Sequence, residues 1–80
     1  MHNALIRLPV VLASRGRSKT AHYDDIASGL FPRGVAVGPR SVAWPAREVE
    51  AVNAARIAGR SNDEIRALVR QLEAARAEPQ

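Results

Sequence analysis

The stretch FPRGVAVGPRSVAWP, residues 31–45, decides the fold of this chain. Valine alternates with small residues over 35–37, and 41–44 repeats that alternation up to a tryptophan, so each run is typical of a short strand with one face on a core. Gly38-Pro39-Arg40 lies between the two runs and favours a turn. We therefore predict a β-hairpin with an arginine at its tip, and Trp44, the only tryptophan, as a core anchor.

The residues before the hairpin are expected to form two short helices. Residues 8–14 form the first, with Pro9 in its first turn and Gly16 as a left-handed residue after its end. Ser18 is a suitable N-cap for the second, over about 19–28. Two short helices joined by a tight glycine-containing turn match the helix-turn-helix pattern.

Two further helices are expected after the hairpin. The third runs over about 45–58, and Pro45 suits its start. The fourth runs over about 62–77 and begins at a capping box, Ser61-Asn62-Asp63-Glu64. Its apolar residues, at 65, 68, 69 and 72, form an amphipathic stripe. The stripe either packs back on the domain or pairs with another copy, and the short chain slightly favours pairing.

Length and composition limit the chain to one domain. Eighty residues support a modest core, and without cysteine there is no disulfide or thiolate metal site. No apolar run approaches the roughly 18 residues that span a bilayer. The start of the chain lacks a basic segment and Pro9 interrupts its apolar run, so we expect no signal peptide and no membrane partner.

Positive charge is concentrated in the first half of the chain. Residues 1–45 carry six basic and two acidic residues, whereas 46–80 carry six arginines and six acidic residues. The net charge of +4 therefore lies entirely in the half that contains the hairpin. Such asymmetry favours a polyanion on one face, although a charge of this size can also serve solubility alone.

The sequence shows no arrangement of residues that is typical of a catalytic site. The two histidines, His2 and His22, have no metal-ligand spacing with other donors, and the adjacent Asp24 and Asp25 diverge by roughly 100° on a helix. Ser18 and His22 are four residues apart, but a helix cap and a surface histidine explain them better than a nucleophile and base do. There is no glycine-rich phosphate loop. We expect no enzyme, no metal site and no cofactor.

Residues 5 to about 58 resemble the AlpA family of prophage regulatory proteins, which are related to excisionases and to the MerR-type DNA-binding domain. The motifs that carry the resemblance are Leu8-Pro9, Val11-Leu12, Gly16, Ser18, Tyr23, Gly29, Phe31-Pro32, Gly38-Pro39-Arg40, Trp44-Pro45 and Glu48-Val49. The resemblance implies a mainly α fold with a small β-hairpin. Residues 1–58 would form a winged helix-turn-helix domain with its wing at about 34–44, and 59–80 a C-terminal amphipathic helix for packing or dimerisation.

The resemblance also implies function. It predicts a sequence-specific double-stranded DNA-binding protein of a prophage or integrated element, in the cytoplasm on the bacterial nucleoid. Regulation of transcription is preferred over an excisionase role in recombination. The protein would act as a homodimer or an array on DNA, with an integrase or RNA polymerase as candidate partners. Asp24, Asp25 and the stripe of the last helix motivate the alternative, a protein-interaction module that binds DNA weakly.

The DNA-binding residues implied by the resemblance fall into two groups. Base readers are expected at the start of the second helix, and phosphate contacts around it and at the wing tip. The base readers are Lys19, Thr20 and Tyr23, with His22 as a weaker candidate. The phosphate contacts are Arg17, Arg33 and Arg40, with Arg15 and the backbone amide of Ser18 as further candidates. Asp24 and Asp25 depart from the family pattern, in which this part of the helix is basic or neutral, and Asp25 has the alternative of pairing near the first helix.

Overall fold

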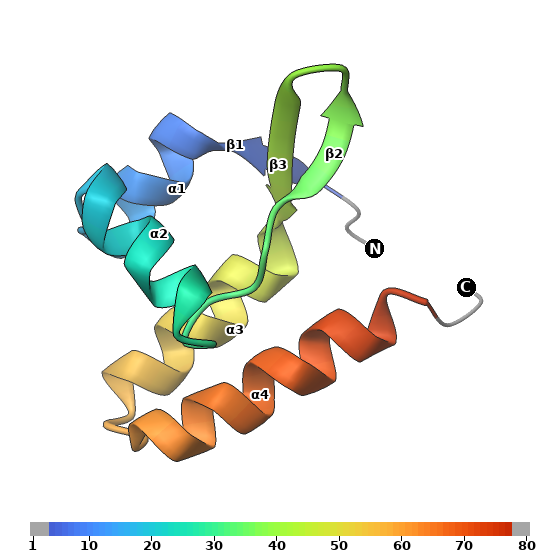
Figure 1. Ribbon diagram of the computed structural model, residues 1–80. Helices are drawn as coiled ribbons and strands as arrows, with labels where there is room; N and C mark the ends of the chain where they lie inside the picture. Colours follow the sequence, from blue (N-terminus) through green and yellow to red (C-terminus); the bar gives the residue numbers. More distant parts are fainter. Residues whose placement is uncertain (1–3, 78–80) are drawn as a thin grey trace.

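In the computed structural model, which describes residues 4–77, a small antiparallel sheet and its hairpin stand on one side of a cluster of helices (Figure 1). The elements are β1 (Leu5–Arg7), α1 (Leu8–Arg15), α2 (Lys19–Ala27), β2 (Val35–Gly38), β3 (Ser41–Pro45), α3 (Ala46–Ile57) and α4 (Asn62–Ala75). The four helices and the hairpin that were predicted are therefore present, with ends that shift by at most two residues. Residues 1–3 and 78–80, which the predicted units 1–58 and 59–80 included, lie outside the described part.

Local capping explains where the helices begin and end. Gly16 follows α1 with φ +67°, a left-handed conformation that glycine adopts without strain. The Ser18 hydroxyl accepts a hydrogen bond from the amide of Ala21 at 3.2 Å and so starts α2. At the start of α4 both bonds of the predicted capping box form, between Ser61 and Glu64, at 2.9 and 3.1 Å.

The sheet has the order β1-β3-β2, so the hairpin strand β3 lies in the middle. Strand β1 was not predicted, because its three residues show no alternation of their own and become a strand only by pairing with β3. Ile6 lies opposite Trp44, and Arg7 lies opposite Ala43. At the base of the hairpin, a Cβ added to Gly34 would lie 3.1 Å from the Trp44 ring, so the chain passes the tryptophan closely there.

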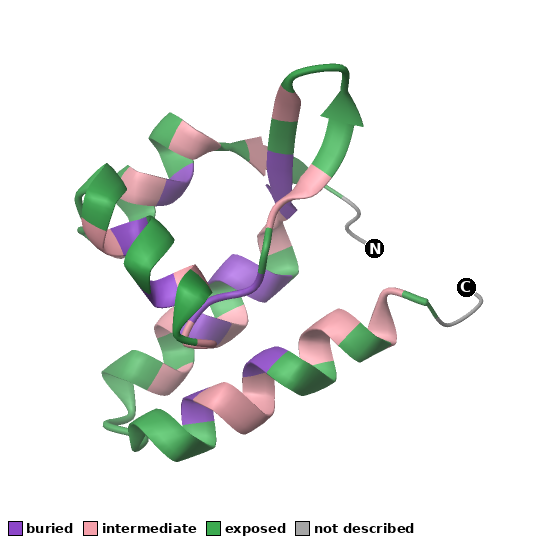
Figure 2. Ribbon diagram, viewed as in Figure 1, coloured by how far each residue is buried: buried purple, intermediate pink, exposed green. Residues whose placement is uncertain are grey.

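The core forms where the sheet meets the helices (Figure 2). Trp44 is fully buried, and its indole nitrogen donates a hydrogen bond to the Pro32 carbonyl at 2.8 Å, which confirms the predicted core anchor. The other buried apolar members of the core cluster are Val11, Phe31, Val49, Val52, Ile65 and Val69. Every helix except α2 contributes a fully buried aliphatic residue to this cluster, and α2 contributes the partly buried Ile26.

Helix α4 packs on the rest of the chain. Ile65 and Val69 belong to the core, and Leu68 and Leu72 pack against it. The stripe therefore packs on its own domain, as the packing alternative predicted, and pairing between copies stays a prediction. No helix within residues 4–77 is long and apolar enough to cross a membrane.

Candidate nucleic-acid interface

Helix α2 divides its residues between an exposed face and a buried face. Lys19, Thr20 and Tyr23 are exposed near its N-terminus, as predicted, and Asp24 is exposed beside them. His22 and Asp25 are buried on the opposite side. The helix start thus presents a cation, a hydroxyl and an aromatic ring to solvent, which are groups that can bind phosphates and base edges.

An open groove of about 410 Å³ lies between the start of α1, the start of α2 and the tip of the hairpin. Its lining residues are Arg7, Leu8, Pro9, Lys19, Tyr23, Arg40, Ser41 and Val42. The groove brings three of the predicted contact residues, Lys19, Tyr23 and Arg40, to one place. It adds Arg7, which sequence reasoning missed because β1 was not expected to lie alongside the hairpin.

The groove is a region of unpaired positive charge. Within residues 4–77, Arg7, Lys19 and Arg40 have no carboxylate within 4.0 Å. Arg33, predicted as a phosphate contact, pairs with Glu73 at 2.9 Å, and its side chain is 68% exposed. Three cations without acidic partners attract a polyanion, and Asp24 on the exposed face of α2 opposes part of that attraction.

Asp25 joins α1 and the turn after it to α2. Its carboxylate accepts a hydrogen bond from Nη2 of Arg15 at 2.7 Å, and two from Arg17 at 2.9 and 3.1 Å. Burial alone would raise the pKa of Asp25, but the bonds from the two arginines outweigh it and hold that pKa below its usual value. Asp25 is therefore an ionised residue that fixes the α1–α2 angle, in line with the alternative of pairing near the first helix.

His22 is buried rather than on the surface, so that part of the sequence interpretation was wrong. The ring is 0% exposed and lies 5.0–5.1 Å from the rings of Tyr23, Phe31 and Trp44, centroid to centroid. Nη1 of Arg15 lies 2.8 Å from Nδ1, and since Arg15 can only donate, Nδ1 accepts and the proton is assigned to Nε2. Desolvation, followed by the charge of Arg15, lowers the pKa of His22.

The side chains of two predicted DNA-contact residues, Arg15 and His22, are buried. The Arg15 side chain is only 4% exposed and its guanidinium lies 3.9 Å over the Phe31 ring, so Arg15 and the fully buried His22 support α2 from inside the fold. The hydroxyl of Ser18 is used in the cap, while Arg17 keeps 43% of its side chain exposed. Charged side chains are rarely buried unless they are paired, and the spacing of residues in the sequence does not show which side chains pair. The burial of Arg15 could therefore not be predicted. Within residues 4–77 there is also no cluster of three metal-ligating side chains.

Comparison with known proteins matches the part of the chain that builds the groove. The family described as prophage CP4-57 regulatory protein (AlpA) matches residues 4–57. A relative from Enterobacteria phage P4, named uncharacterized protein ORF88, is 44% identical over 55 residues, which are 69% of this chain and 62% of the relative. The aligned region thus spans less than two thirds of that relative. No solved structure matches the chain.

Proposed function

Because this chain belongs to the AlpA family of prophage regulatory proteins, we propose that it is a sequence-specific, double-stranded DNA-binding regulator of a prophage or integrated element. The observation that carries the proposal is the groove in which Arg7, Lys19 and Arg40 lie without acidic partners among residues 4–77. A surface of this kind binds phosphates, and an adjacent helix N-terminus can read bases.

The proposed docking places the start of α2 in the major groove. Lys19, Thr20 and Tyr23 then read base edges, because they share the exposed face of the helix. The β2–β3 hairpin acts as a wing, with Arg40 on a phosphate or in the adjacent minor groove. Arg7 and Arg17 contact the backbone on either side of α2.

The test is a fluorescence anisotropy titration of labelled duplexes at several salt concentrations. If about four to six phosphates are neutralised, log affinity falls against log salt with a slope of about −4 to −5. Arg40→Ala is expected to weaken binding to all sequences and to make the slope shallower by about one unit. The control is Arg70→Ala, which removes the same charge from the exposed side of α4. Equal effects of the two variants would contradict the proposed wing contact.

The choice of duplexes separates the regulatory roles. Tiles across the upstream region of the gene and the end of the element are titrated with scrambled competitor. Binding to one or two tiles supports a transcription regulator, whereas stepwise binding to several adjacent tiles supports an excisionase. Specific binding to none of the tiles would contradict the proposal and favour the protein-interaction module.

A further inference from the structure

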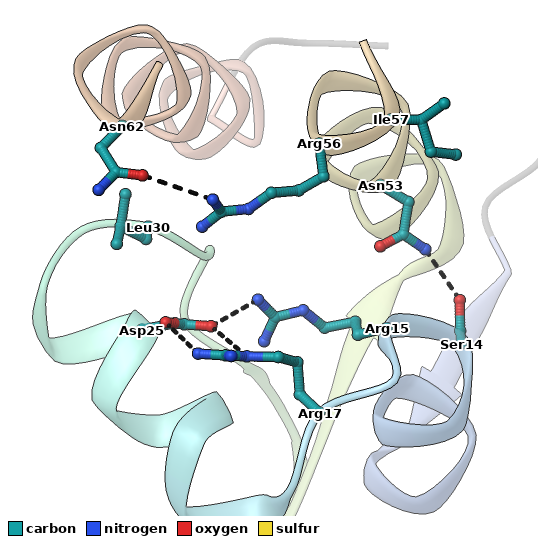
Figure 3. A pocket seen from close by; sticks show the side chains of 9 residues that line it. All are labelled: Ser14, Arg15, Arg17, Asp25, Leu30, Asn53, Arg56, Ile57 and Asn62. Atoms are coloured by element: carbon teal, nitrogen blue, oxygen red, sulfur yellow. Dashed lines mark hydrogen bonds and ion pairs between the residues drawn. The ribbon is translucent and has the colours of Figure 1, made fainter. Parts of the chain in front are cut away.

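A second hollow, of about 570 Å³, lies where the α1–α2 turn, the end of α3 and the start of α4 meet (Figure 3). It shares no lining residue with the groove proposed for DNA. Its polar wall comes from both helices of the helix-turn-helix and from α3 and α4, so it is built from four parts of the chain.

Three guanidinium groups, those of Arg15, Arg17 and Arg56, line this hollow together with a single carboxylate. Asp25 binds Arg15 and Arg17, as described above. Arg56 has no carboxylate within 4.0 Å among residues 4–77, and its side chain makes one long hydrogen bond, 3.4 Å, to Oδ1 of Asn62. In Figure 3 Arg56 reaches from α3 towards Asn62 across the hollow. The hollow therefore has an excess of positive charge and a guanidinium free to bind an anion.

The positive charges around the hollow also act on Arg15, whose side chain is buried. Desolvation lowers the pKa of Arg15, and although Asp25 acts in the opposite direction, the positive charges of Arg17 and Arg56 lower it further. An added anion beside Arg56 would relieve this repulsion. Arginine binds carboxylates through two parallel N–H···O bonds, which favours a planar carboxylate as the ligand.

Two aliphatic side chains, Leu30 and Ile57, line the hollow beside its polar groups. Leu30 lines one side, and Ile57, at the last position of α3, is 87% exposed. An isoleucine with so little contact inside its own chain is suited to contact a partner. A concave site with an unpaired arginine, asparagine amides and aliphatic side chains fits an acidic side chain with an aliphatic neighbour better than it fits a DNA backbone.

We propose that this hollow binds an acidic segment of a partner protein. A carboxylate of the segment binds Arg56 and the exposed edge of Arg17, and an aliphatic neighbour covers Leu30 and Ile57. The proposal does not depend on DNA binding, because no residue lines both the groove and the hollow, and Arg17 alone is assigned a contact on each side. A partner bound here leaves the groove between α1, α2 and the hairpin open.

The test is an NMR titration of the isotopically labelled full chain with a capped Leu-Asp-Leu-Glu-Leu peptide. The matched probe is Leu-Asn-Leu-Gln-Leu, which keeps the shape and removes the charge. We expect the acidic peptide to shift the amides around Arg17, Arg56 and Asn62 and to leave those of the groove unchanged. Arg56→Gln should weaken the binding about tenfold, as expected for one lost charged hydrogen-bond pair. Arg47→Gln, an exposed arginine at the other end of α3, should leave it unchanged.

Other results would overturn the proposal. Equal binding of the neutral peptide would show that the charge is not recognised. Shifts at the hollow with inorganic phosphate but not with peptide would identify a simple anion site. Shifts at the hollow with duplex DNA, lost in Arg56→Gln, would assign Arg56 to the DNA surface. Arg47 and Arg56 are both exposed, so we expect both variants to fold, and a thermal unfolding curve for each verifies this. Failure of the DNA proposal would appear separately, in the Arg40→Ala titration.

Discussion

His22 makes the packing of α2 sensitive to pH. Its pKa is lowered in the folded state, chiefly by desolvation, whereas the unfolded chain has the ordinary value of about 6.5. Below that pH the unfolded state binds the proton more readily than the folded state does, so the free energy of unfolding falls as pH falls. The pH range over which His22 affects stability lies above that of Asp25. The pKa of Asp25 is also lowered, so its contribution to stability is lost only at more acidic pH.

We therefore expect urea unfolding to give a lower free energy at a pH of about 5.5 than at about 7.5. His22→Gln should flatten this dependence while keeping an acceptor for Arg15. The chain has one other histidine, and His2→Gln serves as the control. A pH dependence that disappears in the control and persists in His22→Gln would show that the buried histidine is not its cause.

Asp24 and Asp25 are neighbours with opposite roles, which makes them a matched pair. Asp25→Asn leaves the guanidinium of Arg15 buried without its ion pair, and should lower the free energy of unfolding by about 3 kcal/mol. Asp24 is exposed and has no arginine or lysine within 4.0 Å among residues 4–77, so Asp24→Asn should change it by less than about 0.5 kcal/mol. Chemical denaturation of both variants measures the difference, and similar losses would contradict the role given to Asp25.

At the scale of elements, the sequence predicts those parts that carry their own signals. The caps at Ser18 and Ser61 and the glycine after α1 are local, so the helix ends could be predicted closely. Strand β1 could not, because its strand conformation depends on pairing with β3. For the same reason, Arg7 was not among the predicted contact residues. Burial of Arg15 and His22 depends on Phe31 and Trp44 folding over them, and no spacing within α1 or α2 indicates this.

Helix α4 lies outside the family match and is fixed to the matched region by ion pairs. Just after its end, Arg76 binds both oxygens of Glu48, at 2.6 and 2.9 Å, and also donates to the carbonyl of Arg33 at 2.8 Å. Glu48 is 1% exposed, so it depends on this partner. Arg76 thereby links the end of α4 both to α3 and to the chain that leads into the hairpin.

Arg76→Ala should consequently lower the free energy of unfolding by about 3 kcal/mol, because the Glu48 carboxylate would remain buried without its partner. Arg70→Ala removes an exposed arginine from the same helix and should have an effect within about 0.5 kcal/mol. Chemical denaturation measures both values. A small effect of Arg76→Ala would mean that water or another side chain replaces the arginine beside Glu48.

At the scale of the whole molecule, the arginines among residues 4–77 divide into those paired with a carboxylate and those without such a partner. The arginines beside Asp25, Glu48 and Glu73 hold elements together. Of the six cations without a carboxylate within 4.0 Å among residues 4–77, three line the groove (Arg7, Lys19 and Arg40), Arg56 lines the second hollow, and Arg47 and Arg70 line neither. A net charge of +4 does not reveal this division, since it counts every arginine equally. The two proposed binding surfaces follow from which charges the fold leaves unsatisfied.

The apolar stripe of α4 bears on the oligomeric state, because its residues are already used inside the chain. We expect the protein without DNA to sediment as a monomer. Leu68→Glu should leave that mass unchanged and lower the free energy of unfolding by about 2–3 kcal/mol, since it places a charge against the core. Gln71→Glu adds the same charge on the exposed face of α4 and should be close to neutral. Sedimentation equilibrium and urea unfolding measure the two quantities. A dimer that Leu68→Glu converts to a folded monomer would show that the stripe opens to pair with a second copy.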